Sequence, residues 1–249
     1  MNLVLIYFAI KYKGYFHDIY NAIKTKEFIQ LEELEKIGEQ LNTEKIKAIT
    51  IIDEDYPESL KQINQPPFVL FYEGNKKLLK EKLIMLTGDF SNENISKFIN
   101  ESIIELSKNY TLVSNFSKGL DEDIIDNLVK NNQNLMLISS NGLVNPYFGK
   151  NIKELNFDKN KYLILSEYPA NVNLNYKRLI QRNRISIGLS EALIIASSYK
   201  DSKILNLVSC ALEQGKDIFC FPGLQNDNDG NNLLISDGAK MITSIKNKN

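Results

Sequence analysis

The sequence is poor in the residues on which many catalytic centres depend. Its 249 residues include one histidine, His17, and two cysteines, Cys210 and Cys220. A serine or cysteine nucleophile needs a base within hydrogen-bond reach, and the histidine falls in an N-terminal helical segment. The cysteines lack the spacing of metal ligands and the carboxylates are scattered. We therefore expect no catalytic residues and no metal.

Phosphate-binding glycine motifs are absent as well. Thr87-Gly88-Asp89-Phe90 follows the first strand expected in the main domain, and it holds one glycine where a dinucleotide-binding turn has the pattern G-x-G-x-x-G. No P-loop pattern occurs elsewhere in the sequence. These absences predict a non-enzymatic protein without a cofactor, one that binds phosphates and does not turn them over.

The sequence also lacks an excess of charge and a long apolar run. Thirty Lys and Arg residues against thirty-one Asp and Glu residues give a formal net charge of -1, so any anion site must be local. The apolar run from Leu3 to Ile10 is shorter than the ~20 residues that cross a bilayer, and it predicts a buried helix. With two cysteines expected to remain reduced thiols, the sequence predicts a cytoplasmic protein without a membrane partner.

Three stretches of the chain differ in their pattern. Residues 1 to about 48 place apolar side chains at helical spacing and predict a small helical domain. Residues 49–81 combine turn signals with the short apolar run Phe68 to Tyr72, which predicts a connector and an entry strand. Residues 82–249 form the third stretch and predict the main domain.

Apolar runs alternate with helical patterns throughout the main domain. This alternation predicts an α/β fold, a Rossmann-like and mainly parallel sheet with helices on both faces, preceded by the small helical domain. The expected strands are residues 83–86, 111–113, 135–138, 162–165, 192–196 and 218–221, with a further one around 241–242.

Small or polar residues follow each expected strand. They include Thr87-Gly88, Ser114-Asn115, Ser166-Glu167 and Ser197-Ser198. Parallel sheets of this class bind ligands beyond the carboxyl ends of their strands, where helix N-termini favour anions. Small or polar residues after a single strand are explained by the capping of the helix that follows. Because many such exits converge on one edge, we expect an anion site there, whereas Glu167 is expected to accept a hydrogen bond from a neighbour.

Arginine occurs only three times, at Arg178, Arg182 and Arg184. Lysine supplies the other cationic positions, so a segment that collects every arginine is suited to hold an oxyanion with planar, permanently charged groups. Chance, or packing of the arginine stems on the core, is the alternative. We expect the three guanidinium groups to gather at the sheet edge and form one positive hollow, together with Lys177.

Several blocks between about residue 50 and residue 240 keep the order and spacing of one family. Tyr56-Pro57 and Pro66-Pro67 come first, and the later blocks are Ser114 to Asp121, Ser166-Glu167-Tyr168-Pro169, Arg182-Asn183-Arg184-Ile185, Gly188-Leu189-Ser190, Ala211-Leu212-Glu213-Gln214-Gly215, Phe221-Pro222-Gly223 and Gly230-x-Asn232 with Gly238-Ala239. The chain resembles the DNA-processing family DprA, also called Smf. Its N-terminal helices look like the SAM-like domain that precedes the Rossmann-like domain in many members.

The resemblance implies a non-enzymatic protein that binds single-stranded DNA, forms a homodimer and loads the RecA recombinase on incoming DNA during natural transformation. Such binders combine a basic groove with aromatic side chains on which bases stack. The site residues expected on this basis are Arg182, Asn183, Arg184, Arg178, Lys177, Lys118, Ser114, Gly88 and Phe116, with Phe116 as the stacking aromatic.

The chain also departs from the family at the exit of the first strand of the main domain. The family has Gly-Ser-Arg there, and this chain has Gly88-Asp89-Phe90, which puts an acid near the expected phosphate. Two alternatives therefore remain open. One is a protein that binds or hydrolyses nucleotides, of the lysine-decarboxylase-like Rossmann group, although this chain has Pro222-Gly223-Leu224 in place of that group's Pro-Gly-Gly motif. The other is a partner-binding scaffold that has lost DNA binding.

Overall fold

The computed structural model describes residues 2–43, 47–117, 119–144, 157–170, 172–223 and 230–245. The helices within these residues are α1 (Leu3–Lys11), α2 (Phe16–Lys24), α3 (Leu31–Thr43), α4 (Glu58–Lys61), the 3₁₀ helix η1 (Lys76–Lys80), α5 (Glu93–Leu106), α6 (Leu120–Lys130), α7 (Tyr176–Leu189), α8 (Leu205–Glu213) and α9 (Gly230–Ser236). The strands are β1 (Lys47–Thr50), β2 (Val69–Gly74), β3 (Leu83–Gly88), β4 (Thr111–Ser114), β5 (Leu135–Ile138), β6 (Tyr162–Ser166), β7 (Ala192–Ser197), β8 (Asp217–Cys220) and β9 (Lys240–Met241).

The nine strands of the described residues form one sheet in the order β1-β2-β6-β5-β4-β3-β7-β8-β9. From β6 to β9 in this spatial order, all neighbouring strands are parallel. At the other end of the sheet, β1 pairs antiparallel with β2, and β2 pairs antiparallel with β6. The central strands β3 to β7 are buried on both faces, which explains why their sequences are continuous apolar runs and do not alternate. The predicted Rossmann-like, mainly parallel fold is confirmed.

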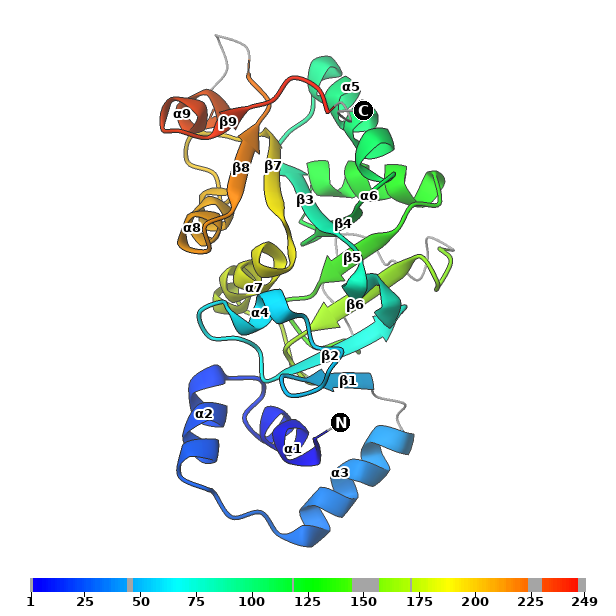
Figure 1. The fold of residues 1–249 in the computed structure, drawn as a ribbon, viewed down its shortest axis with the longest axis vertical. Helices are drawn as coiled ribbons and strands as arrows, with labels where there is room; N and C mark the ends of the chain where they lie inside the picture. Colours follow the sequence, from blue (N-terminus) through cyan, green and yellow to red (C-terminus); the bar gives the residue numbers. More distant parts are fainter. Residues whose placement is uncertain are drawn as a thin grey trace.

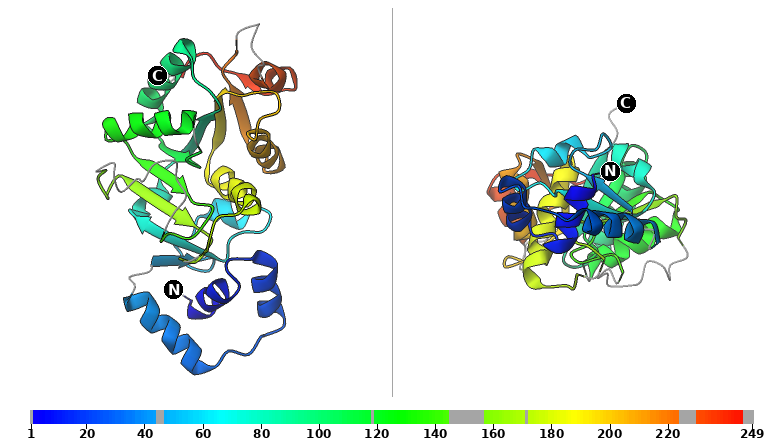
Figure 2. Two further views of the ribbon diagram at one scale, coloured as in Figure 1. Left: turned by 180° about the vertical axis from the view of Figure 1, so that it is seen from behind. Right: turned by 90° about the horizontal axis from the view of Figure 1, so that it is seen from below.

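Helices cover both faces of this sheet, as Figure 1 shows with α7 and α8 on one side and α5 and α6 on the other. The view from behind in Figure 2 gives the same arrangement. One core joins α4, α7 and α8 to the sheet around Met85, Val113 and Leu193. A second core joins α5 and α6 to the other face around Leu86, Leu112 and Ile194. Each helix layer thus has its own apolar face and fixes the loops at the strand ends.

The three N-terminal helices lie at the β1 edge of the sheet, at the bottom of Figure 1. Their buried residues form a third core, which includes Val69 and Phe71 of β2. The predicted buried helix at Leu3 to Ile10 is confirmed, since α1 buries Leu5 to Ala9. The expectation that helix continues to about residue 48 is wrong, because α3 ends at Thr43 and Lys47–Thr50 pairs with β2 as a strand.

The expected strands of the main domain agree with β3 to β9 within two residues at each end. The connector contributes more to the sheet than its turn signals indicate, because β2 pairs with both β1 and β6. The boundaries at residues 48 and 82 remain a prediction about how the chain divides into domains.

Candidate nucleic-acid interface

The order of the strands reverses between β3 and β7. From β3 the chain proceeds through β4, β5 and β6 in one direction, and then it returns to place β7 and β8 on the other side of β3. The loops after β3 and β7 therefore leave the sheet side by side and lead to helices on opposite faces. Open parallel sheets bind ligands at such a reversal, at the carboxyl ends of the strands.

Close packing at the end of β3 requires glycine at position 88. A Cβ atom on Gly88 would lie 2.3 Å from Leu120 Cδ2 and 2.8 Å from Ser197 Oγ. The neighbouring loops are bound together beyond this point, because Ser197 Oγ donates to the Phe90 carbonyl at 2.6 Å and accepts from the Phe90 amide at 3.1 Å. Gly88 thus sets how closely the two loops approach each other.

A pocket of about 360 Å³ opens beside these loops, on the face covered by α7 and α8. We name it the α7–α8 pocket. Its lining residues are Thr87 and Gly88 at the end of β3 with Asp89 after it, Asn115, Phe116 and Ser117 after β4, Tyr176, Leu179, Ile180, Arg182 and Asn183 of α7, and Lys203, Ile204, Asn206 and Leu207 at the start of α8. Helices α6 and α8 both begin beside it. The first amides of α8 already donate to the Ser202 and Lys203 carbonyl oxygens, so the helix dipoles, and not free amides, favour an anion in this place.

Arg182 is the arginine that lines this pocket. Its Nη1 donates to the Asn115 carbonyl oxygen at 2.8 Å, which fixes the guanidinium group against the loop after β4. The same loop is held by Asn183, whose side-chain oxygen accepts from Asn115 Nδ2 at 3.0 Å, and by a hydrogen bond from Ser186 Oγ to Asn115 Oδ1. The predicted site residues Arg182 and Asn183 therefore lie together at the carboxyl edge.

Asp121 lies behind this edge at the start of α6 and is fully buried. Its carboxyl group accepts from Thr87 Oγ1 at 2.7 Å and from the Ser117 amide at 3.0 Å. Burial raises the pKa of Asp121 to about 6, and these hydrogen bonds and the charge of Arg182 limit the rise. The carboxyl group thus titrates close to neutral pH beside the arginine of the pocket.

Arg184 points away from the α7–α8 pocket and is bound to an acid. Its Nη2 lies 2.5 Å from Glu167 Oε2 and its Nη1 2.8 Å from Glu167 Oε1, while its Nε donates to the Gln65 carbonyl at 3.0 Å. This paired geometry confirms that Glu167 accepts hydrogen bonds from a neighbour. It also leaves Arg184 neutralised by a buried carboxylate.

Arg178 faces a third direction, towards the N-terminal helices. Its guanidinium carbon lies 5.3 Å from the ring centre of Tyr15 and 5.1 Å from that of Tyr168, and its Nη1 donates to the Asn173 carbonyl. The expectation that the three guanidinium groups gather in one hollow is therefore wrong. Arg184 leaves a different side of α7 from Arg182, whereas Arg178 lies one turn before Arg182 on the same side and reaches Tyr15 and Tyr168 in place of the loop after β4.

Phe116 was expected to stack on a base, but its side chain is only 1 % exposed. Its backbone has a φ of 49°, and the ring packs into the core beneath α5 and α6. The role as an exposed stacking platform is wrong for the conformation described, because the ring presents no free face. Ser114, also buried, accepts a hydrogen bond from the Phe116 amide at 2.9 Å and so shapes this turn.

The site residues predicted from the sequence also include two lysines. Lys118 lies outside the described residues. Lys177 is exposed in the first turn of α7, next to the pocket residue Tyr176 but not among the residues that line the pocket.

The pocket contains functional candidates that the sequence did not single out. Tyr176 is 59 % exposed, and Lys203 Nζ lies 6.0 Å from the centre of its ring. Asp89, the acid already noted in the sequence after Gly88, accepts a hydrogen bond from the Tyr199 amide at 2.9 Å through Oδ2. Tyr176 opens the arginine-rich segment, so its position was a usable signal, whereas the approach of Lys203 from α8 depends on the fold.

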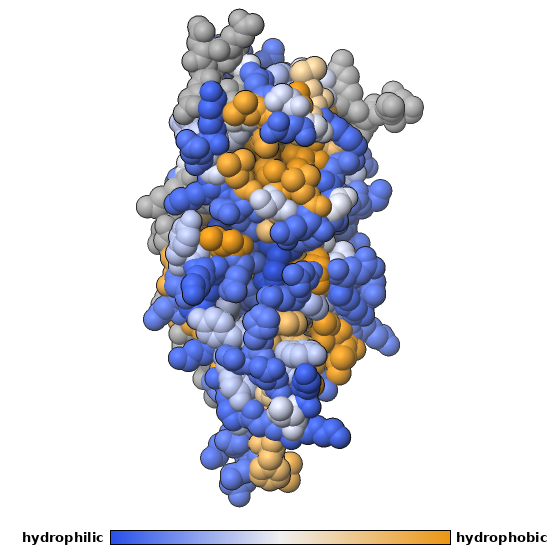
Figure 3. Space-filling model, turned by 90° about the vertical axis from the view of Figure 1, so that its left-hand side faces the viewer, coloured by the Kyte–Doolittle hydropathy of each residue, from blue (hydrophilic) through white to orange (hydrophobic). Residues whose placement is uncertain are grey.

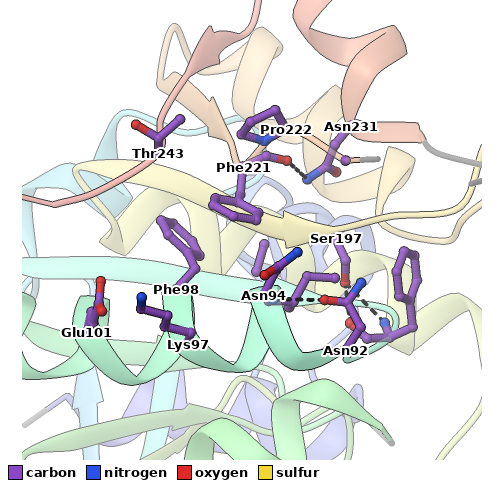
Figure 4. Close-up of a pocket in the computed structure, with 14 residues that line it drawn as sticks. Asn92, Asn94, Lys97, Phe98, Glu101, Ser197, Phe221, Pro222, Asn231 and Thr243 are labelled. Atoms are coloured by element: carbon purple, nitrogen blue, oxygen red, sulfur yellow. Dashed lines mark hydrogen bonds between the residues drawn. The ribbon is translucent and has the colours of Figure 1, made fainter. Parts of the chain in front are cut away.

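A second pocket, of about 310 Å³, lies on the other side of the loop that follows β3. We name it the α5 pocket; Figure 4 shows Asn94 and Phe98 of α5 facing Phe221, with Ser197 and Thr243 at its rim. The Phe98 and Phe221 rings stack with centres 4.3 Å apart and an interplanar angle of 24°. The two pockets thus flank the point at which the strand order reverses.

Within the described residues, no group of three or more histidine, cysteine, aspartate or glutamate side chains could hold a metal ion. Nor is any helix of the described ranges long and apolar enough to cross a bilayer.

Comparisons with known proteins agree with this geometry. A family described as DNA recombination-mediator protein A matches residues 47–248. DNA processing protein DprA from Streptococcus pneumoniae is 32% identical over 205 residues, which cover 81% of this chain and 72% of that protein. DNA processing protein DprA from Bacillus subtilis is 31% identical over 206 residues, covering 81% of this chain and 69% of that protein.

Two solved structures are similar to this chain. The X-ray structure of DprA from Streptococcus pneumoniae superposes with a TM-score of 0.76 at 27% identity, covering 98% of this chain and 90% of that one. DNA processing protein A from Helicobacter pylori, described for its single-stranded DNA binding mode, gives a TM-score of 0.67 at 24% identity, covering 78% and 90%. At that identity the second likeness concerns the fold.

Proposed function

Since the chain belongs to the DNA recombination-mediator protein A family, also called DprA or Smf, we propose that this recombination mediator binds single-stranded DNA in the α7–α8 pocket. The observation that carries the proposal is Arg182, a largely buried arginine that lines a pocket beside which α6 and α8 begin. A cation and the positive ends of two helix dipoles beside one pocket favour an anion, and the phosphates of a single strand are anions.

Arg182 contacts a phosphate in this proposal, and Lys203 adds a second charge at the rim. Tyr176 offers an exposed ring on which a base stacks, which is how binders that tolerate any sequence gain affinity. Gly88, Ser114 and Asn183 shape and position the loops, whereas Arg178 and Arg184 hold α7 in place. Lys177 and Lys118 remain proposed contacts to the DNA backbone.

The test is a titration of a fluorescent oligothymidine, followed by anisotropy across a salt series. The wild type binds at low salt and loses affinity as salt rises, because phosphate contacts release counterions. Arg182→Ala weakens binding to all sequences alike by about 1–3 kcal/mol, since phosphates carry no base identity. Absence of binding at low salt, or an unchanged affinity in the variant, contradicts the proposal.

We propose further that the bound protein loads RecA on single-stranded DNA. The family description as a recombination mediator supports this step. It predicts that the protein shortens the lag before RecA assembles on DNA coated with a single-strand-binding protein. Arg182→Ala should lose this effect at concentrations that no longer saturate the DNA.

We also propose that the protein forms a homodimer through the end of the sheet at β9. Figure 3 shows an apolar patch on the face that carries α8, α9 and β9. Leu212 of α8 and Met241 of β9 are 68 % and 63 % exposed, and β9 is the last strand of the sheet. An exposed apolar patch next to a sheet edge is suited to self-association. Light scattering on a sizing column tests this proposal, because Leu212→Glu should convert the dimer to a monomer.

The mediator proposed here needs no catalytic residue. Glu167, the acid at a strand exit, is held by Arg184, so the alternative of nucleotide hydrolysis has no carboxylate ready at that position. Incubation with nucleoside monophosphates should therefore give no turnover above the background rate.

A further inference from the structure

We propose that the α5 pocket is a nucleobase site, which receives a base of the same DNA strand whose phosphate occupies the α7–α8 pocket. The inference rests on the proposed function, because it concerns the continuation of that strand.

The pocket has the shape and lining that a planar heterocycle requires. Its floor is aromatic, with Phe98 and Phe221 stacked at 4.3 Å and Phe90 on the side of the loop after β3. Figure 4 shows the Asn94 side chain standing between α5 and β7, in front of this floor. Stacking on aromatic rings combined with an amide that both donates and accepts hydrogen bonds is how proteins hold unpaired bases.

The charges at the rim decide between a base and a phosphate. Lys97 and Glu101, one turn apart on α5, both line the pocket and carry opposite charges. The deeper polar group Asn231 is already engaged, since its Nδ2 donates to the Ile195 and Phe221 carbonyl oxygens and its Oδ1 accepts from Ser198 Oγ. A neutral rim over an aromatic floor favours an uncharged heterocycle and offers little to a phosphate.

Adjacency links the two pockets. Asp89 lines the α7–α8 pocket and the next residue, Phe90, lines the α5 pocket. Phe90 also packs against Tyr199, with ring centres 4.8 Å apart and Tyr199 exposed on the outside. A strand that crosses this loop passes an aromatic pair between its phosphate site and its base site. Phe90 and Tyr199 thereby give this loop an aromatic surface.

The experiment uses oligothymidines in which one nucleotide at a time is abasic, and it compares the wild type with Asn94→Trp. Asn94 is exposed, so a tryptophan there fills the pocket without removing a core side chain. Ile104→Trp, at an exposed position of α5 outside the pocket, is the matched control. Thr243→Trp blocks the pocket from outside α5, so a loss of affinity shared by both variants cannot come from a local distortion of α5.

For the wild type, we expect an abasic site at one position of the strand to lower the affinity about tenfold. Both blocking variants lose about tenfold for the intact strand, show no further loss at that position, and keep the salt dependence of the wild type. Ile104→Trp behaves as the wild type. If the blocked variants bind the intact strand as tightly as the wild type, or retain the abasic penalty, the base site is refuted while DNA binding stands. If the wild type binds no single strand at low salt, the proposed function falls and the base site falls with it.

Discussion

The two sides of α7 present the same residue type under opposite conditions. Arg182 lines a pocket, donates to the Asn115 carbonyl oxygen and lies near the buried carboxyl group of Asp121, whereas Arg184, two residues on, is bound to Glu167 through both of its Nη atoms. Both arginines belong to one short segment with one composition. The surroundings of each arginine are therefore decided by the partner groups that the fold brings to it, and not by the number of cations in the segment.

The pair formed by Arg184 and Glu167 should matter most for stability. Arg184→Ala leaves Glu167, which is 5 % exposed, buried without its partner, and should lower the free energy of unfolding by about 3–5 kcal/mol. Urea denaturation measures this loss, and Glu167→Gln in the same background should restore part of it. The folded variant should still bind single-stranded DNA with nearly the affinity of the wild type. If Arg184→Ala lost as much DNA affinity as Arg182→Ala, the two arginines would not differ in their roles.

On the pocket side, the acid near Arg182 gives a pH-dependent effect. The pKa of Asp121 is raised from 3.8 to about 6, so the folded protein favours the protonated carboxyl group. This contribution to stability is fully present below about pH 4 and is lost as the pH rises through about 6, by up to about 3 kcal/mol. Denaturation at a series of pH values should show this decline in the wild type relative to Asp121→Asn. Parallel pH profiles for the two proteins would contradict the assignment.

Tyr176 tests whether the open side of α7 contacts bases. Tyr176→Ala should lower the affinity for single-stranded DNA by about 1–2 kcal/mol, because a stacking surface is removed. Tyr176→Phe keeps the ring and should bind as the wild type does. The salt dependence should be the same in all three proteins, since no phosphate contact changes. An equal loss in the phenylalanine variant would assign the effect to the hydroxyl group and not to stacking.

Lys203 should give the smallest effect and the most specific one. Lys203→Ala should lower the affinity about threefold and reduce the slope of log K against log salt by about 0.7, the value for one phosphate of a single strand. Lys200→Ala, an exposed lysine outside the pocket, is the control and should change neither quantity. A change in slope for both lysine variants would indicate a general electrostatic attraction of the DNA and not a defined contact of Lys203 with one phosphate.

The sequence predicted the sheet well because its main signal is local. Apolar runs such as Leu135 to Ile138 are short, continuous and followed by small polar residues, which is typical of a buried parallel strand. The strand Lys47–Thr50 was missed, because its four residues alternate weakly and its pairing with β2 is a contact across the connector. Its existence depends on the partner and not on its own pattern.

The site was predicted less completely than the fold. The arginine segment led to α7, and Gly88 and Asn183 were placed at the correct edge. The partners of Arg178 and Arg184 could not be derived, because Tyr15 and Glu167 lie on other elements. Hydrogen bonds between distant elements leave no periodic pattern in the sequence. Phe116 failed for a related reason, since a positive φ at one residue turned its ring into the core.

The position of Arg178 between Tyr15 and Tyr168 has a consequence for shortened forms of the protein. Nη2 of Arg178 donates to the Tyr15 hydroxyl at 3.1 Å, so the loop between α1 and α2 anchors the first turn of α7. A fragment that starts at β1 would expose the apolar strand residue Phe71 and would remove the Tyr15 contact to the helix that carries Arg182. The first helices therefore help to position the edge of the sheet at which we propose that DNA binds. In a variant that lacks them, weaker DNA binding could come from lost contacts or from a displaced α7.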